Sequence, residues 1–207
     1  MDFYLKTVPK STQAVLESLK KVSEIQTFYL SGGTALSLLL GHRESEDLDF
    51  FSKTEFQPQV LQQKLLQCGV LENVQIAEGT LNLYINKVKL QFLHYPYDLL
   101  EDLTQWKGIY LSSVTDIACT KLITISMRGS KKDFVDLYFI LQKMSLEELF
   151  EKLEEKYHDV HYNYPHILKS LVYFEDANLQ PMPRMHISVD WEQVKVFILQ
   201  QVKKFTF

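Results

Sequence analysis

The chain has few cysteines and no long apolar run. Its 207 residues include two cysteines, Cys68 and Cys119, and both lie in apolar helical patterns that suit buried free thiols. Two isolated cysteines exclude a disulfide framework and a cysteine-rich zinc site, and they fit a reducing compartment. No apolar run approaches the roughly 18 residues of a membrane span, and the first residues lack a signal-peptide pattern. We therefore expect a cytoplasmic protein with no membrane partner.

An excess of positive charge is also missing. The formal net charge is −4 at pH 7, whereas a dedicated high-affinity nucleic-acid binder is usually basic. That class is therefore disfavoured, although a local basic patch that holds an RNA end remains compatible with the sequence. Hydrophobic residues make up 46% and charged residues 23%, which is typical of a soluble globular protein. The length fits one large domain, or a core domain with a helical extension.

The periodicity of apolar residues divides the chain into a mixed half and a helical half. Strands are predicted over 27–31, 47–51, 80–86 and 88–93, and Asn86-Lys87 is a plausible tight turn. Predicted helices cover 11–26, 34–41, 54–69, 113–127, 131–143, a segment capped by Ser145, 165–174 and 189–204. We expect an α/β (α+β) fold with a small mixed sheet flanked by helices over 1–112, followed by a helical region over 113–207. The two regions can also form one compact unit, because a shift in composition rather than a linker separates them.

A double glycine lies between a predicted strand and a predicted helix. Gly32 and Gly33 follow the apolar strand 27–31, and Thr34 opens the next helix. Glycine permits a close approach of a ligand to the backbone, and the free N–H groups at a helix start favour a phosphate. On its own, the pair is also compatible with an ordinary tight turn.

Two carboxylates follow on the next predicted strand. Asp47 and Asp49 are two residues apart, so their side chains share one face of the strand. They interleave with Leu48, Phe50 and Phe51, and unpaired carboxylates in so apolar a strand are costly to desolvate. The alternative is a solvated pair of carboxylates at a sheet edge. A Mg²⁺ ion between the carboxylates would offset their desolvation cost, and Mg²⁺ also bridges phosphates. Together, the glycines and the carboxylates predict a metal-dependent enzyme that handles nucleoside triphosphates.

The whole segment is more specific than its parts. It comprises Gly32-Gly33-Thr34-Ala35-Leu36, His42-Arg43, Ser45 and Asp47-Leu48-Asp49-Phe50-Phe51. This pattern resembles the AbiEii/AbiGii toxin family of nucleotidyltransferases, within the polymerase-β-like superfamily. A second segment follows in the order that the family has: Lys121, Arg128 and Lys132-Asp133-Phe134-Val135-Asp136-Leu137. The resemblance covers about residues 25–142 and implies a nucleotidyltransferase-fold core.

The resemblance implies roles for the residues of the first segment. Gly32, Gly33 and Thr34 would cradle the triphosphate of a nucleoside triphosphate, which would be the substrate. Asp47 and Asp49 would hold Mg²⁺, or Mn²⁺, against the phosphates and would count among the catalytic residues.

The resemblance also implies roles for the second segment. Lys121 would neutralise charge on the phosphates. Asp136 would either orient Lys121 or assist deprotonation of the attacking hydroxyl, and it completes the catalytic set with Lys121. Arg43, Arg128 and Asp133 are further candidates for nucleotide binding. In this interpretation, the helical region completes the active site.

One position departs from the superfamily pattern. A third carboxylate usually lies on a later strand, and the corresponding position here is Gln91 in the strand 88–93. A neutral amide is a poor base and a weak ligand for Mg²⁺, so a standard two-metal mechanism is in doubt. Either Asp136 compensates, or one metal suffices, or activity is weak or lost.

The resemblance favours transfer of a nucleoside monophosphate to a hydroxyl of a macromolecule. The acceptor would be RNA, such as a tRNA 3′ end, or a protein, in a toxin–antitoxin or phage-defence setting that implies a cognate antitoxin. Two other classes of function stay open. One is an inactive nucleotide-binding module, which is considered because Gln91 replaces the expected carboxylate. The other is a nucleotidyltransferase that modifies a small molecule such as an antibiotic, which the acidic charge balance slightly favours.

Overall fold

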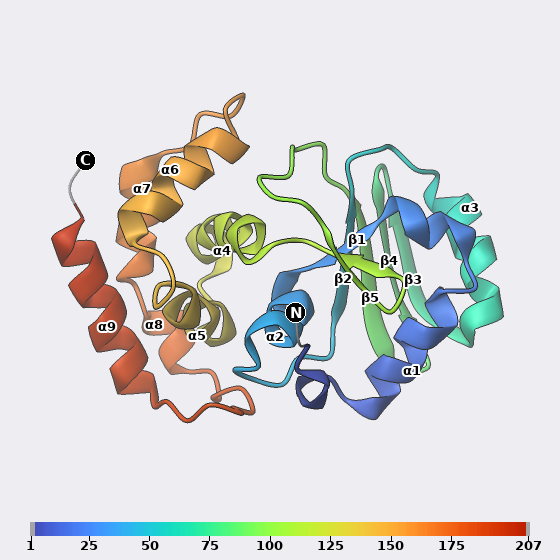
Figure 1. Ribbon diagram of the computed structural model, residues 1–207, viewed down its shortest axis with the longest axis horizontal. Helices are drawn as coiled ribbons and strands as arrows, with labels where there is room; N and C mark the ends of the chain where they lie inside the picture. Colours follow the sequence, from blue (N-terminus) through green and yellow to red (C-terminus); the bar gives the residue numbers. More distant parts are fainter. Residues whose placement is uncertain (1–2, 206–207) are drawn as a thin grey trace. The chain divides into compact units, whose positions relative to one another are not determined.

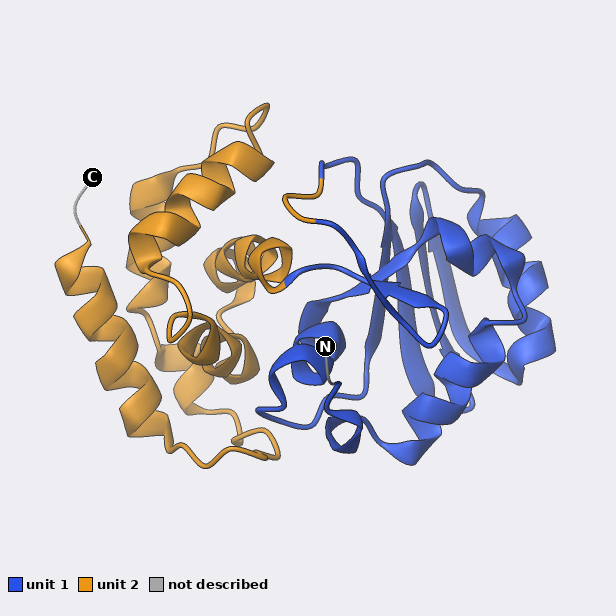
Figure 2. Cartoon of the chain, viewed as in Figure 1, with its two compact units in different colours: residues 1–98, 102–113 blue, residues 99–101, 114–207 orange. Residues whose placement is uncertain are grey.

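The chain divides into two compact units. The computed structural model describes residues 3–205. One unit comprises Met1–Asp98 and Asp102–Ser113, and the other comprises Leu99–Glu101 and Val114–Phe207 (Figure 2). We call them the sheet unit and the helical unit, because every strand of the described residues lies in the first. The predicted fold class, a mixed sheet with helices followed by a helical region, is confirmed.

The sheet unit holds one mixed sheet in the strand order β3-β4-β5-β2-β1-β7-β6 (Figure 1). Strand β2 lies antiparallel to β1 and parallel to β5, and β1 lies parallel to β7. The remaining neighbours are antiparallel. The strands are β1 (Tyr29–Ser31), β2 (Leu48–Ser52), β3 (Leu71–Ala77), β4 (Thr80–Ile85), β5 (Val88–His94), β6 (Thr104–Trp106) and β7 (Ile109–Leu111).

Three strands were absent from the sequence prediction. Strands β6 and β7 have three residues each, too short for a period to show, and the side chains of β3 are mostly exposed. The predicted strand 47–51 begins one residue later, so Asp47 immediately precedes β2. The turn at Asn86-Lys87 is confirmed, because both residues take positive φ values of 49° and 69°, as a two-residue hairpin of type I′ requires.

One face of the sheet is apolar and covered by helices. Helix α1 (Lys10–Leu19) contacts β5, and α3 (Pro58–Leu65) contacts β3 and β4. Beneath them, alternate residues of the strands are buried, including Leu83 of β4 and Phe92 of β5. This alternation follows from the two-residue period of a strand. It leaves the intervening polar side chains on the opposite face.

Two helices of the sheet unit are shorter than predicted. The expected helix 11–26 ends at Leu19, because Val22 takes an extended conformation, and a 3₁₀ helix follows over Ser23–Thr27. The expected helix 54–69 begins at Pro58, whose missing N–H suits a first turn, and it continues as a 3₁₀ turn over Leu66–Cys68. A further 3₁₀ turn covers Leu5–Thr7.

Helix α2 (Gly32–Leu40) packs against β1 and β2. It ends as predicted at Gly41, which has a left-handed φ of 72° and whose N–H donates a terminal hydrogen bond to the Ser37 carbonyl. The helix therefore connects the end of β1 to the loop that leads into β2.

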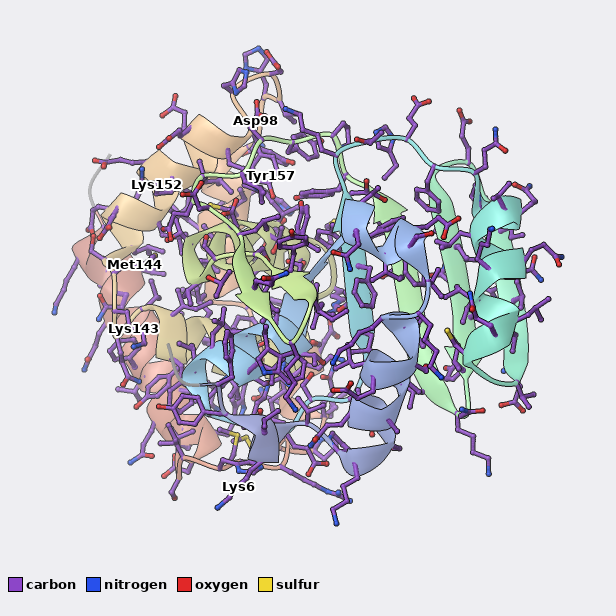
Figure 3. All side chains as sticks on the ribbon, turned by 45° about the vertical axis from the view of Figure 1, so that its right-hand side comes forward. Lys6, Asp98, Lys143, Met144, Lys152 and Tyr157 are labelled. Carbon is purple, nitrogen blue, oxygen red and sulfur yellow. The ribbon has the colours of Figure 1, made fainter. Side chains whose placement is uncertain are left out.

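The helical unit is built around α4 (Val114–Arg128). This helix packs against α5 (Lys131–Ile140), α6 (Leu146–Lys156) and α7 (Tyr164–Leu171). Helix α9 (Trp191–Lys204) packs against α5 and α7, and α8 (Glu175–Asn178) against α5. The predicted cap is present, since the Ser145 hydroxyl accepts a hydrogen bond from the Glu148 N–H. In Figure 3, Tyr157 marks the end of α6, where its buried ring contacts Tyr162.

A buried ion pair connects two of these helices. Lys156 Nζ of α6 lies 2.6 Å from Asp116 Oδ1 of α4, and both side chains are almost inaccessible to solvent. The same Asp116 oxygen accepts a hydrogen bond from the Leu100 N–H at 3.1 Å. The segment 99–101 is thereby joined to the helical unit.

Both cysteines are free and buried, as the sequence predicted. Burial raises the pKa of the Cys68 thiol, and it raises that of Cys119 to about 12. Within residues 3–205, no helix combines the length and the apolar character that crossing a bilayer requires.

Candidate active site

The two glycines lie at the junction of β1 and α2. Gly32 has a φ of +64°, a left-handed conformation that glycine tolerates better than other residues. A Cβ atom at this position would overlap Oδ2 of Asp49, so the carboxylate lies directly over the Gly32 backbone. The register between β1 and β2 sets this approach, because Ser31 pairs with Asp49. A side chain at Gly32 would therefore displace the carboxylate.

Gly33 makes room for a buried cation. A Cβ on Gly33 would lie 2.6 Å from Nη2 of Arg43 and 3.2 Å from the Ser45 hydroxyl. Arg43 is only 3% exposed, and its Nη1 donates to the Glu44 carbonyl at 2.9 Å. A fixed positive charge thus lies beside the start of α2, where free N–H groups already favour an anion.

Thr34 holds the residue that precedes β2. Its side chain is fully buried, and its hydroxyl donates to the Asp47 carbonyl and lies 2.9 Å from the Ser45 hydroxyl. A contact of Thr34 with the triphosphate stays a prediction. The structure adds a second role, since Thr34 fixes the backbone that presents Asp47.

The two aspartates and Gln91 lie at the centre of the sheet. Asp49 is the second residue of β2, Asp47 immediately precedes the strand, and both are partly exposed. Asp49 pairs in register with Gln91 of β5, and residues paired in this way project from the same face. An uncharged amide therefore lies next to Asp49, at the position where a third carboxylate was expected.

The donor set fits a magnesium ion that arrives with its substrate. The described residues contain no group of three or more His, Cys, Asp or Glu side chains that could hold a metal by itself. Magnesium, however, is usually bound through one or two carboxylates and substrate phosphates, and it keeps several waters. Asp47 and Asp49 supply oxygen ligands of this kind, and Mn²⁺ accepts the same ligands.

A second group of predicted residues forms a buried cluster in the helical unit. Lys121 Nζ of α4 lies 2.7 Å from Asp133 Oδ1 and 2.6 Å from Asp136 Oδ2, both of α5. All three side chains are buried. The spacing of three residues places the two aspartates on one helix face, and here both contact the same lysine.

Two further residues complete the shell around Asp133. Arg128 Nε lies 3.0 Å from Asp133 Oδ2, and the Ser130 hydroxyl donates to the same oxygen at 2.6 Å. Burial alone would raise the pKa of Asp133, but Lys121 and Arg128 outweigh it and lower the pKa to about 2. The carboxylate is therefore ionised at neutral pH, and the two cations balance the two aspartates.

The structure places the predicted residues in two groups and adds others. Gly32, Gly33, Thr34, Arg43, Asp47 and Asp49 belong to the sheet unit, and Lys121, Arg128, Asp133 and Asp136 belong to the helical unit. Ser31, whose hydroxyl accepts a buried 2.9 Å hydrogen bond from Ser112, was missed because an isolated serine gives no signal. Ser130 was missed as well, although its position just before α5 is one where a serine is favoured.

Comparison with known proteins identifies the family. The sequence model described as "Nucleotidyl transferase AbiEii toxin, Type IV TA system" matches residues 14–73 and 90–205. The uncharacterized protein aq_aa25 of Aquifex aeolicus (strain VF5) is 34% identical over 207 residues, which cover 97% of this chain and 98% of that protein.

Solved structures share the fold at low identity. MenT4, the nucleotidyltransferase toxin Rv2826c of Mycobacterium tuberculosis H37Rv, has a TM-score of 0.64 at 15% identity, covering 95% of this chain and 82% of that one. A putative nucleotidyltransferase of H. pylori has a TM-score of 0.56 at 18% identity, covering 94% and 93%. The family match spans most of the chain and both groups of site residues. The chain therefore belongs to the AbiEii toxin family of type IV toxin–antitoxin systems and is a nucleotidyltransferase.

Proposed function

We propose that the protein transfers a nucleoside monophosphate from a nucleoside triphosphate to a hydroxyl of a macromolecule, in a reaction that depends on Mg²⁺. The acceptor is RNA, such as tRNA, or a protein, and the reaction takes place in the cytoplasm. A cognate antitoxin controls the activity, in keeping with the family. The observation that carries the proposal is the approach of the Asp49 carboxylate to Gly32 at the start of α2.

The sheet unit supplies the phosphate and metal ligands. The free N–H groups at Gly32 and Gly33 bind phosphate oxygens, and the Arg43 guanidinium adds positive charge beside them. Asp47 and Asp49 would hold the metal ion, which supplies a Lewis acid that stabilises charge on the phosphate oxygens. Because Gln91 adds no charge next to Asp49, the arrangement favours one metal over two.

Lys121 and Asp136 of the helical unit keep the roles in this reaction that the family resemblance implies. In the displacement, the acceptor hydroxyl gives its proton to solvent, its oxygen forms a bond to the α-phosphorus, the bond from that phosphorus to the oxygen that bridges to the β-phosphate breaks, and pyrophosphate leaves. Lys121 neutralises part of the charge that develops on the phosphates. The 2.6 Å contact between Asp136 and Lys121 supports the role of Asp136 in orienting the lysine over that of a base.

The test is label transfer from nucleoside triphosphates labelled at the α-phosphate, with bulk tRNA and lysate protein as acceptors. We expect a labelled macromolecule that disappears with EDTA and with Asp49→Asn, while Asp102→Asn, a change at an exposed carboxylate of the sheet unit, retains transfer. Tight binding of the magnesium–nucleotide complex without any product would support the inactive module instead. Label on a low-mass acceptor alone would support the small-molecule enzyme.

A further inference from the structure

A row of polar side chains crosses the solvent-facing side of the sheet. Asp49 pairs with Gln91, Gln91 pairs with Asn82 of β4, and Asn82 pairs with Gln75 of β3. Side chains paired in register project to the same face, so the row runs from the proposed metal ligand toward the β3 edge. Neighbouring strands lie about 4.8 Å apart. Asn82 is therefore roughly 10 Å from Asp49 along the row, about the length of one nucleoside.

Gln75, Asn82 and Gln91 of this row line a hollow of about 500 Å³ in the sheet unit. Asp49 is the neighbour of Gln91 in the row. The polar residues that line the hollow are Asn73, Gln75, Asn82, Tyr84, Lys89 and Gln91. Strand β3 is irregular where it borders the hollow, because its register shifts between Glu72 and Gln75 and Asn73 takes a φ of 50°. Bulges bend the strand that carries them and re-aim its side chains. The hollow thus lies beside an irregular part of the sheet edge.

The lining has the chemistry of a nucleotide site. Four amide side chains offer both donors and acceptors, which match the edge of a nucleobase. Tyr84 and Lys89 are cross-strand neighbours, and they offer a ring for stacking and a cation for a phosphate. No Asp or Glu is among the described residues that line the hollow, so it is poorly suited to a polycationic small molecule.

One atom of the hollow lacks a protein partner. Asn82 Oδ1 is buried and accepts no hydrogen bond from any described residue. Buried polar atoms are nearly always paired, so this amide would have to turn toward the hollow to meet a donor from a ligand. The family match does not assign this site, since residues 74–89 lie outside it.

We propose that the hollow binds the terminal nucleotide of an RNA acceptor and presents its ribose hydroxyl beside Asp49. This inference rests on the proposed function and names the acceptor class. Gln75 and Asn82 hydrogen-bond the base, and Lys89 contacts the phosphate of the preceding linkage. Gln91 lies between the base and Asp49, where a neutral amide contacts the ribose without repelling the phosphates.

A binding measurement tests this inference independently of catalysis. We would measure fluorescence anisotropy of a labelled single-stranded RNA with a free 3′ hydroxyl, in EDTA so that no transfer occurs. Gln75→Leu and Lys89→Met should each weaken binding roughly tenfold, and Lys89→Met should also reduce the salt slope by about 1. Gln63→Leu and Lys64→Met, exposed positions of α3 on the other side of the sheet, are the matched controls and should bind as the wild type does.

The outcomes distinguish the two proposals. Absence of label transfer to any acceptor contradicts the proposed function, whereas the binding result stands by itself. The inference is overturned if the wild type does not bind the RNA, or if both hollow variants bind the RNA as tightly as the wild type does. It is also overturned if the aminoglycoside kanamycin binds the protein as tightly as the RNA does and displaces the RNA. Label transfer to protein that is unaffected by Gln75→Leu and Lys89→Met also overturns it.

Discussion

Asp49 of β2 and Gln91 of β5 lie side by side in register on neighbouring parallel strands. Asp49 carries the negative charge that binds a metal ion, and Gln91 carries a neutral amide where the superfamily usually has a carboxylate. In the proposed function, this pair favours one metal ion over two. It also connects the proposed metal ligands to the hollow described above.

Restoring the carboxylate should make folding stability depend more on the metal. In Gln91→Asp, two like charges lie directly opposite each other, which destabilises the metal-free protein by about 0.2–1 kcal/mol. Mg²⁺ should remove this repulsion, so the rise in Tm on adding Mg²⁺ should be larger than in the wild type. Gln91→Asn is the neutral control. An equal metal response in Gln91→Asp and Gln91→Asn would contradict the placement of the ion next to Asp49.

A methyl group at Gly32 should damage nucleotide binding. Gly32→Ala places a Cβ against the Asp49 carboxylate and also strains a left-handed backbone, at a cost of about 1–3 kcal/mol. Gly108→Ala is a matched control, because its φ of +83° brings similar strain while no atom lies within 4 Å of the new Cβ. Titration calorimetry with a magnesium–nucleotide complex should show weaker binding in Gly32→Ala alone. Comparable losses in both variants would mean that strain, not the carboxylate, is responsible.

Removing the Thr34 hydroxyl should loosen the loop before β2. Thr34→Val keeps the shape of the side chain but leaves the Asp47 carbonyl without this donor, which costs about 1–3 kcal/mol. Urea denaturation measures that loss. We further expect the apparent affinity for Mg²⁺ to fall, because Asp47 is then less firmly placed. Ser18→Ala, which removes a hydroxyl bond within α1, is the control and should leave metal affinity unchanged.

Acid should weaken the helical unit through Asp133. Its pKa is lowered from the ordinary 3.8 to about 2, so the carboxylate stabilises the folded state fully above pH 4. This contribution, about 2 kcal/mol, is lost as the pH falls from 4 toward 2. The difference in unfolding free energy between the wild type and Asp133→Asn should therefore shrink over that range. A difference independent of pH would show that the ion pairs contribute little.

Lys121 should be essential for folding as well as for activity. Lys121→Met leaves Asp133 and Asp136 buried with one cation fewer, and breaking a buried ion pair costs about 3–5 kcal/mol. Lys121→Met/Asp136→Asn removes one charge of each sign and should recover much of the stability, as urea denaturation would show. Label transfer should stay absent in the double variant. Recovery of activity together with stability would reduce Lys121 to a structural role.

Local pattern determined much of this protein from the sequence alone. The alternation of apolar and polar residues predicted β4 and β5, and Gly41 predicted the end of α2. The pairs Gly32-Gly33 and Asp47/Asp49 indicated phosphate and metal chemistry. These features depend on residues close together in the chain, whose spacing is set by the period of a helix or strand. Even Gln91, the neutral residue at the expected position of a third carboxylate, was identified from its place in the predicted strand 88–93.

Contacts between distant residues were decided only in three dimensions. The strand register places Asp49 over Gly32 and beside Gln91. Arg43 is buried behind Gly33, and Asp133 and Asp136 both contact Lys121. Each of these contacts joins residues from different elements. The register shift of β3 beside the hollow belongs to the same class. Pairing and packing choose among many partners that a local pattern cannot rank, because their free energy arises only when the whole sheet or helix bundle has formed.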